Sequence, residues 1–406
     1  MSTNPPRRKA SRSRRIFLGA FGQPGHAFPM LALGRRLVER GHHVTFETWE
    51  RWREPVTAAG IDFLPAPEYP IFPTAERPLK PYQAVERATA PTRAAIIACR
   101  PDVVVHDILT LAPALAAELE GVPTATLIPH LFPVTAPGFP PYSIGARLPR
   151  TRAGRAVWGA FERPLDRGLR HGRDELNETR RRLGLEALER LHGGLSPRLC
   201  LVASFPQLEY PREWPPGVHV VGPMLWEPAA PTVAPPGGSA PLLVAAPSTS
   251  HDPAQRLLRA TLEGLRRAPV RVLAATDRRA ARAPIRAGRN ARLVNWMSYP
   301  EAMRDAALVI CHGGHGTMAR ALERGVPVLV VPHSGDMAEN AARIDWAGVG
   351  VRLPWRLLSA RTLRLAVEGA LEERKALAAR AGELAAWAAV NDGPTRAAEL
   401  IEELPT

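Results

Sequence analysis

Two stretches of alternating strand and helix patterns, separated by a proline-rich break, constrain the fold of this chain most strongly. In the first stretch, from residue 16 to about 205, short apolar runs such as 103–107 alternate with segments that carry apolar residues at helical spacing. The alternation restarts after residue 240 and ends in a helical stretch from 362 onward. Such alternation favours parallel sheets covered by helices on both faces, so we predict an α/β chain with two doubly wound halves.

The break between the halves sets the expected domain limits. Residues 223–240 are rich in proline, glycine and alanine and match no packed element, so they are predicted to be an interdomain linker. We therefore expect an N-terminal domain over 16–222 and a C-terminal domain over 241–406, with the last helix packing back toward the N-terminal domain. The two domains should face each other across a cleft at the carboxyl ends of their strands, where doubly wound sheets bind ligands. Residues 132–160, rich in proline and glycine, are expected to form a long functional loop.

Charge and cysteine content limit the partners and the compartment. The formal net charge is +14, but six basic residues lie within residues 1–15, which carry no apolar pattern and are predicted to be a disordered tail. The remaining charge of about +8 is spread along the chain, so we do not expect nucleic acid as a partner. No run of 18 apolar residues predicts a membrane span, and no segment has the pattern of a secretory signal. Cys99, Cys200 and Cys311 are widely spaced and offer neither a disulfide framework nor a zinc site. We expect a cytoplasmic monomer or homodimer.

The motif His-Gly-Gly-His-Gly-Thr, at 312–317, carries the strongest chemical signal. It follows the apolar run 307–311 and leads into a helical pattern that begins at Met318. Its glycines allow the backbone to approach a ligand closely, and a helix N-terminus attracts anions. Thr317 adds a hydroxyl donor and His312 an imidazole donor. The motif predicts an anion-binding loop suited to a diphosphate, and it is not a Walker loop because no Gly-Lys-Ser/Thr follows.

With Pro332, Asp336 and Asn340, this loop resembles the C-terminal signature of the family 1 glycosyltransferases, which have the two-domain GT-B fold. The resemblance is closest to the bacterial enzymes that glycosylate antibiotics and related natural products. It implies an inverting transfer that needs no metal ion and no cofactor, with a dTDP- or UDP-linked sugar as co-substrate.

The resemblance also assigns roles to residues of the C-terminal half. The loop should hold the donor diphosphate, Asp336 should bind sugar hydroxyls and Asn340 should support that end of the site. Trp296 should lie near the nucleobase, with backbone contacts from Met297, and the segment after the first strand of this half should reach the phosphates. The implied donor-binding residues are Ser248, Thr249, Trp296, Met297, His312, Gly314, Gly316, Thr317, Asp336 and Asn340.

Two departures from the family pattern bear on the donor. Met337 stands where the family has glutamine, so one contact to the sugar is lost, which would suit a less hydroxylated deoxysugar. Ser298 and Tyr299 stand where the family often has Pro-Gln, so the nucleotide base is left open.

His26 and Asp107 are the candidate catalytic residues of the N-terminal half. Each follows an apolar run, and the resemblance pairs a histidine and an aspartate at these places. Histidine has an ordinary pKa of about 6.5 and serves as a base near neutral pH, while a carboxylate fixes its tautomer. The glycines beside His26 have the spacing G-x-x-G-x-x-G, which is not the dinucleotide fingerprint and argues against a nicotinamide-dependent dehydrogenase. His106 is predicted to be structural.

The acceptor is expected to be a small apolar or aromatic natural product. This expectation depends on composition alone, from the aromatic residues Phe72, Phe132, Phe139 and Tyr142. Three other readings of the same fold stay open at this stage: C-glycosylation of an aromatic carbon, a sugar-nucleotide epimerase, and a non-catalytic binder of sugar nucleotides.

Overall fold

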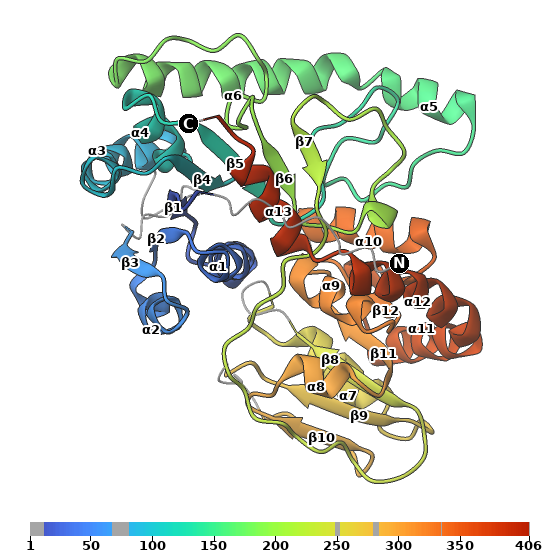
Figure 1. The fold of residues 1–406 in the computed structure, drawn as a ribbon. Coiled ribbons are helices and arrows are strands. Elements are labelled where there is room, and N and C mark those ends of the chain that lie inside the picture. Colours follow the sequence, from blue (N-terminus) through green and yellow to red (C-terminus); the bar gives the residue numbers. More distant parts are fainter. Residues whose placement is uncertain (1–11, 67–80, 248–251, 279–283, 334, 406) are drawn as a thin grey trace, which may run out of the picture. The chain divides into compact units, whose positions relative to one another are not determined.

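The computed structural model describes residues 12–66, 81–247, 252–278, 284–333 and 335–405. It contains two α/β parts, each built on a sheet, so the predicted fold class is confirmed (Figure 1). The chain divides into two compact units that interleave along the sequence. Unit 1 comprises the residues up to 127, 174–201 and those from 394 onward, and unit 2 comprises 128–173 and 202–393. The domain limits at 222 and 241 stay a prediction.

The first sheet has the strand order β3-β2-β1-β4-β5-β6-β7. Strand β1 pairs in parallel with both β2 and β4, so that Gly19 is aligned with Glu47 on one side and His106 on the other. The direction of the strand order reverses between β1 and β4, and the carboxyl ends beside such a reversal are where doubly wound sheets bind ligands. The strands are β1 Arg15–Gly19, β2 His43–Thr48, β3 Asp62–Pro65, β4 Val103–Asp107, β5 Thr124–Ile128, β6 Cys200–Val202 and β7 Val218–Val220.

The second sheet, of order β10-β9-β8-β11-β12-β13, is parallel throughout and is covered on both faces. Along β8, Leu242 and Val244 belong to one buried core, while Leu243 and Ala245 belong to the core on the opposite face. Fully buried strands of this kind explain why the sequence shows continuous apolar runs here. The strands are β8 Leu242–Ala246, β9 Arg271–Ala275, β10 Ala291–Val294, β11 Ala306–Cys311, β12 Val328–Val330 and β13 Gly350–Arg352.

Local capping explains where several helices begin. The Asp252 carboxylate accepts hydrogen bonds from the backbone of Arg256 and Leu257 at the start of α7, and Ser359 forms a capping box with Thr362 at the start of α11. The helices are α1 Pro24–Glu39, α2 Arg53–Ala58, α3 Pro81–Cys99, α4 Ala112–Leu119, α5 Arg152–Gly159, α6 Glu162–Arg182, α7 Arg256–Gly264, α8 Tyr299–Met303, α9 His315–Glu323, α10 Asp336–Ala347, α11 Ala360–Glu372, α12 Arg374–Val390 and α13 Gly393–Glu402, with short 3₁₀ turns η1 Glu50–Trp52, η2 Pro206–Leu208 and η3 Trp355–Leu357.

Two sequence-based expectations about irregular segments need correction. The loop expected over 132–160 ends earlier, because Thr151 accepts a hydrogen bond from Gly154 N and caps α5. The basic tail expected over 1–15 is also too long. Its residues 1–11 lie outside the described part, but Arg15 is the first residue of β1, and the Arg14 guanidinium donates to Leu404 O at 2.9 Å.

The segment 223–240 contains no helix or strand, as expected, but it is hydrogen-bonded to the second sheet. Arg271 donates to the carbonyls of Pro236 and Ala240, and Arg292 donates to that of Ala234. Backbone carbonyls that no sheet uses are thus satisfied by arginines of the second sheet.

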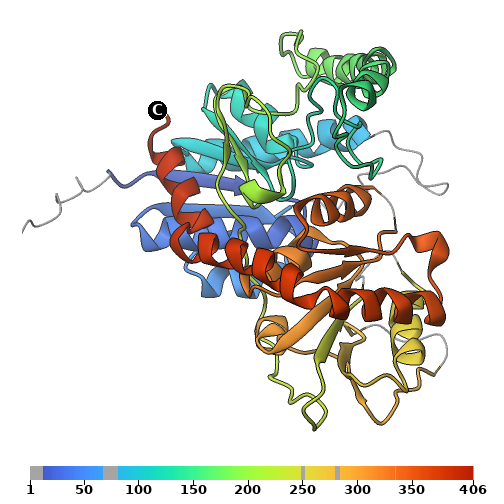
Figure 2. The ribbon, with the colours of Figure 1, turned by 90° about the vertical axis from the view of Figure 1, so that its right-hand side faces the viewer.

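Helix α13 belongs to unit 1, where it lies beside the start of β1 and the end of α1 (Figure 2). Its Glu402 accepts a two-pronged hydrogen bond from Arg40, at 2.6 and 2.7 Å, and lies 2.9 Å from His42 Nε2. These bonds lower the pKa of Glu402 to about 2. Helix α13 is therefore held in unit 1 by the ion pair between Arg40 and Glu402 as well as by apolar packing.

Candidate active site

His26 and Asp107 meet at the carboxyl edge of the first sheet. His26 is in the first turn of α1, directly after β1, and Asp107 is the last residue of β4. Because β1 and β4 are neighbouring parallel strands, both residues arrive at the same edge. The His26 Nδ1 atom lies 2.8 Å from Asp107 Oδ1, with the imidazole 15% exposed and the carboxylate fully buried.

The second oxygen of Asp107 holds the carboxylate in place. Asp107 Oδ2 accepts hydrogen bonds from Leu109 N at 3.0 Å and from the Thr110 hydroxyl at 3.3 Å. A carboxylate accepting at Nδ1 fixes the proton of a neutral imidazole on that nitrogen and leaves the lone pair on His26 Nε2.

Two of the three glycines before His26 serve close packing, whereas a Cβ on Gly25 would meet nothing within 4 Å. A Cβ on Gly19 would lie 2.4 Å from Pro113 Cγ, and one on Gly22 would lie 2.1 Å from Trp49 Cγ. The Gly22 carbonyl also accepts a hydrogen bond from Trp52 Nε1 at 2.7 Å. Phe21 packs edge-on against both His26 and Trp49, so an apolar wall stands beside the imidazole.

Two buried ionisable groups near this edge have shifted pKa values. Burial lowers the pKa of His106 to about 4, and its Nε2 lies 2.8 Å from the Thr126 hydroxyl, which agrees with its predicted structural role. Burial raises the pKa of Glu47, at the end of β2, to about 7, although its hydrogen bond from Thr92 acts in the opposite direction. Sequence reasoning missed Glu47, whose only signal is a carboxylate beside the apolar residues Val44 and Phe46 of its strand.

The 312–317 loop joins β11 to α9, and the helix begins earlier than the sequence predicts. Helix α9 starts at His315 rather than at Met318, so Gly316 and Thr317 lie in its first turn. The N-cap residue of this helix is Gly314, which has no side chain to cap the first N–H groups. Gly316 is exposed and Thr317 is half-buried.

The glycines of this loop are required by the backbone. Gly313 has φ +92°, and a Cβ there would lie 2.8 Å from Val330 Cγ1. A Cβ on Gly314 would lie 2.8 Å from His312 Nε2. His315 is buried and donates from Nε2 to Ala203 O at 3.2 Å; burial lowers its pKa to about 4, so it is neutral at neutral pH.

Helix α10 carries the next two predicted donor residues. Asp336 is its first residue and is half-buried. Asn340, one turn later, is fully buried, and its Nδ2 donates to Gly313 O at 2.9 Å. Asn340 therefore fixes the 312–317 loop from the neighbouring helix. Met337 is only 5% exposed, so its side chain packs inward and does not take the place of a polar sugar contact.

The predicted nucleobase site follows β10. The ring of Trp296 is half-buried and is covered by the Arg278 guanidinium, 4.8 Å from its centroid. Met297 is 1% exposed and packs in the core, so its backbone is the part able to meet a ligand. Ser248 and Thr249 lie outside the described residues.

The aromatic residues expected to meet an acceptor are less exposed than composition suggested. Phe132 is only 2% exposed and carries the Arg212 guanidinium at 5.0 Å from its ring centre, while Phe139 packs edge-on against Tyr210. Tyr142 is half-buried, with its hydroxyl 3.2 Å from His130 Nδ1. Phe72 lies outside the described residues. Buried Phe132 is therefore a core residue, which corrects its predicted role.

Membrane-spanning helices and clustered metal ligands are both absent from the part of the chain that the structure describes. No helix among them is long and apolar enough to cross a membrane. Within the same ranges, no three His, Cys, Asp or Glu side chains gather in a way that could hold a metal ion.

The C-terminal half matches a known protein family, and nearly the whole chain is similar to two characterised enzymes. Residues 259–404 match the family described as erythromycin biosynthesis protein CIII-like, C-terminal domain. The 4′-demethylrebeccamycin synthase of Lentzea aerocolonigenes is 27% identical over 96% of this chain and 99% of its own. The O-mycaminosyltylonolide 6-deoxyallosyltransferase of Streptomyces fradiae is 29% identical over 96% of this chain and 97% of its own.

Solved structures give the fold. A glycosyltransferase of kitacinnamycin superposes with a TM-score of 0.78 at 22% identity, covering 97% of this chain and all of that one. A spinosyn rhamnosyltransferase complexed with thymidine diphosphate superposes with a TM-score of 0.67 at 20% identity, covering 96% and 100%. The predicted GT-B fold and the predicted resemblance to natural-product glycosyltransferases are confirmed.

Proposed function

Because this chain has the GT-B fold and is similar to natural-product glycosyltransferases over nearly its whole length, we propose that it transfers a deoxysugar from a dTDP- or UDP-linked donor to a small apolar or aromatic acceptor with inversion. The acceptor belongs to the N-terminal part, 16–222, and the donor to the C-terminal part, 241–406. The observation that carries the proposal is the hydrogen bond between His26 and the buried Asp107, at 2.8 Å.

His26 acts as the base. Its Nε2 takes the proton of the acceptor hydroxyl as the oxygen attacks the anomeric carbon, and the bond from that carbon to the diphosphate breaks on the opposite face. Asp107 keeps Nδ1 protonated during this step and stabilises the imidazolium that forms. The Phe21 wall excludes water from one side of the ring.

The 312–317 loop binds the leaving diphosphate. The uncapped first turn of α9 offers N–H groups and a favourable dipole, and Thr317 and His312 offer side-chain donors. This set stabilises the charge that grows on the leaving group without a metal ion. Ser248 and Thr249 complete the phosphate contacts.

Asp336 and Trp296 set the two ends of the donor. Asp336 accepts hydrogen bonds from sugar hydroxyls at the N-terminus of α10, and the base lies near Trp296. With Met337 buried, fewer polar groups face the sugar, which supports a deoxysugar. The 6-deoxyallosyl and rhamnosyl names of two similar proteins, one bound to thymidine diphosphate, support a dTDP-6-deoxyhexose.

A thermal-shift measurement in EDTA tests the donor half. The protein is titrated with dTDP, UDP, GDP and NAD⁺, and we expect Tm to rise with dTDP or UDP. A rise with NAD⁺ alone would overturn the transferase proposal.

Transfer itself is followed by mass spectrometry with dTDP-L-rhamnose and dTDP-glucose against a panel of aromatic and macrolactone acceptors. The glycoside should carry the anomeric configuration opposite to that of the donor. His26→Ala should give no product under conditions where the wild type does. Retained configuration in the product would contradict the single displacement.

A further inference from the structure

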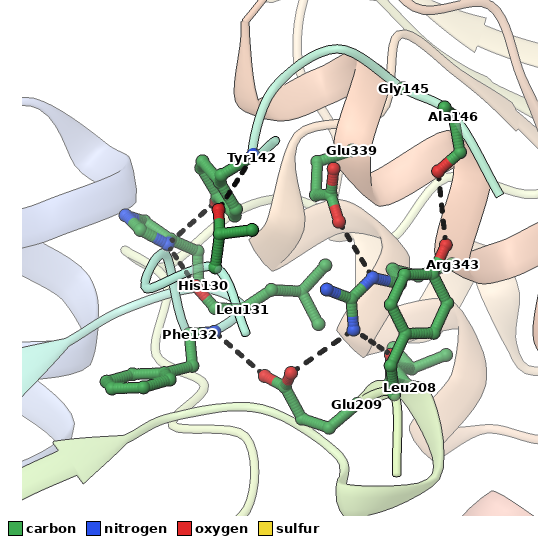
Figure 3. Close-up of polar contacts among 12 residues, drawn as sticks. His130, Leu131, Phe132, Tyr142, Gly145, Ala146, Leu208, Glu209, Glu339 and Arg343 are labelled. Carbon is green, nitrogen blue, oxygen red and sulfur yellow. Dashed lines mark hydrogen bonds and ion pairs between the residues drawn. The ribbon is translucent and has the colours of Figure 1, made fainter. Parts of the chain in front are cut away.

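A cluster of buried charges lies in unit 2 and is not used by the mechanism above (Figure 3). Arg343, on α10, donates from Nε to Glu339 Oε1 at 2.8 Å and from Nη1 to Glu209 Oε2 at 3.2 Å. The three residues are 5%, 2% and 5% exposed, in that order. The Arg343 guanidinium also lies over the ring of Tyr210, 3.5 Å from its centre.

A contribution to folding stability does not by itself explain why these charged residues are buried together. Burial raises the pKa of both Glu209 and Glu339, and Arg343 acts against this rise. Taking such charges out of water is costly, and apolar residues of similar volume are often as stable. A buried guanidinium is planar and donates several hydrogen bonds in fixed directions. It therefore fixes the geometry between the elements whose groups it binds.

The first element joined is the segment 130–146. Glu209 Oε1 accepts a hydrogen bond from Phe132 N at 2.8 Å, and the Tyr210 hydroxyl donates to Ala146 O at 3.3 Å. Gly145 packs so closely on α10 that a Cβ there would lie 2.9 Å from the Cβ and the carbonyl oxygen of Ala338. The segment is therefore fastened at both ends.

The phosphate-binding loop is held on the same helix by a separate contact, which does not involve Arg343. Asn340 lies on α10 between Glu339 and Arg343 in sequence, and it donates to Gly313 O. A continuous set of contacts thus runs from Gly313 through α10 and Glu209 to Phe132 N. Asp336 begins the same helix.

We propose that Arg343 is a positioning residue for the donor sugar. It holds α10 and the segment 130–146 as one body, so that Asp336, at the helix start, keeps a fixed place at the sugar. The proposal rests on the proposed function, because it takes Asp336 to be a sugar contact. It predicts that Arg343 matters for the sugar and not for the diphosphate, which the backbone of the 312–317 loop binds.

The test compares Arg343→Met, Arg343→Lys and a matched control, Arg147→Met. Arg147 pairs with Asp345 of the same helix, but its side chain is 57% exposed. Isothermal titration gives Kd for dTDP and for dTDP-L-rhamnose. We expect Arg343→Met to weaken the sugar nucleotide about tenfold or more and dTDP less than about twofold. Arg343→Lys should recover part of the loss, and Arg147→Met should resemble the wild type.

Hydrogen–deuterium exchange on the same proteins gives a readout that needs no ligand. Arg343→Met should increase exchange in 130–146 and 336–347, with little change in unit 1. Equal weakening of dTDP and the sugar nucleotide, or unchanged exchange in 130–146, would overturn the positioning role. A wild type that binds neither nucleotide would instead refute the dTDP-linked donor of the proposed function, while the exchange result would still decide whether Arg343 holds the segment.

Discussion

The ends of β4 and β11 occupy corresponding places in the two sheets, yet they present different chemistry. Each strand is the neighbour of the central first strand, β1 in one sheet and β8 in the other, and each lies where the strand order reverses. Strand β4 ends in Asp107, a buried carboxylate aimed at His26. Strand β11 ends in a glycine-rich turn that leaves a helix start uncapped.

This difference shows that two similar sheets can supply different parts of one reaction, catalytic side chains in one and a backbone binding site in the other. At β4 the chemistry resides in side chains, and Gly19 and Gly22 only make room for Pro113 and Trp49. At β11 it resides in the backbone, and Gly313 is needed for its positive φ. Side-chain changes should therefore damage turnover at the first place, and backbone changes should damage ligand binding at the second.

The largest expected effect is at His26. His26→Ala removes the base, so kcat should fall by about 10²–10⁴-fold while Kd for dTDP stays within about twofold. Steady-state kinetics with the acceptor found by mass spectrometry measures the first quantity, and titration calorimetry the second. His43→Ala, at an exposed position at the start of β2, is the matched control. Turnover retained in His26→Ala would assign the base elsewhere.

Asp107→Asn should have the next largest effect. The amide oxygen can keep the bonds from Leu109 N and Thr110, so the amide nitrogen turns toward His26. A donor there forces the imidazole proton onto Nε2 and removes the lone pair that the base needs. We expect kcat to fall about 10²–10³-fold with Tm nearly unchanged. If kcat fell in Asp107→Ala but stayed at the wild-type value in Asp107→Asn, only the volume of the side chain would matter, and the tautomer argument would be contradicted.

Gly313→Ala addresses the backbone side of the comparison. The alanine must adopt φ +92° and meets Val330 at 2.8 Å, so the loop shifts. Kd for dTDP should rise about tenfold or more, and stability should fall by about 1–3 kcal/mol. Gly369→Ala, inside α11 with open space around it, is the control and should be slightly stabilising. Unchanged dTDP affinity in Gly313→Ala would remove the loop from the donor site.

The last prediction concerns the pH dependence of stability and the role of Glu47, at the end of β2. Its pKa in the folded protein, about 7, is above its ordinary value of 4.5. Its contribution to stability is therefore complete below pH 4.5 and is lost as the pH rises to 7. Denaturant unfolding at pH 5 and 8 should show a loss of about 2–3 kcal/mol in the wild type and a much smaller loss in Glu47→Gln. Glu54→Gln, at an exposed position, should behave as the wild type.

The fold was largely predictable because the strands are buried on both faces. Apolar runs such as Val103–Val105 and Leu242–Ala246 indicate strands that are buried on both faces, and several of the helices between them end at glycines. Helix α5 was missed because it has no buried residue and hence no tertiary apolar signal. The early start of α9 was missed because glycines in a first turn look like loop residues.

Site residues could be predicted where they belong to a recognisable sequence motif. They could not be predicted where only tertiary packing brings them together. His26 and Asp107 lie far apart in the sequence, and only the pairing of β1 with β4 places them 2.8 Å apart. Glu209 and Arg343 give no motif at all, since a charged residue in a loop or on a helix is normally exposed. Their burial depends on contacts between segments more than 100 residues apart, which local patterns do not encode.

The most direct test of this division of labour is the calorimetric titration of dTDP, in EDTA, into the wild type, His26→Ala and Gly313→Ala. The account predicts that the wild type and His26→Ala bind dTDP with Kd values within about twofold, and that Gly313→Ala binds about tenfold or more weakly. Equal weakening in both variants, or no binding by the wild type, would contradict it.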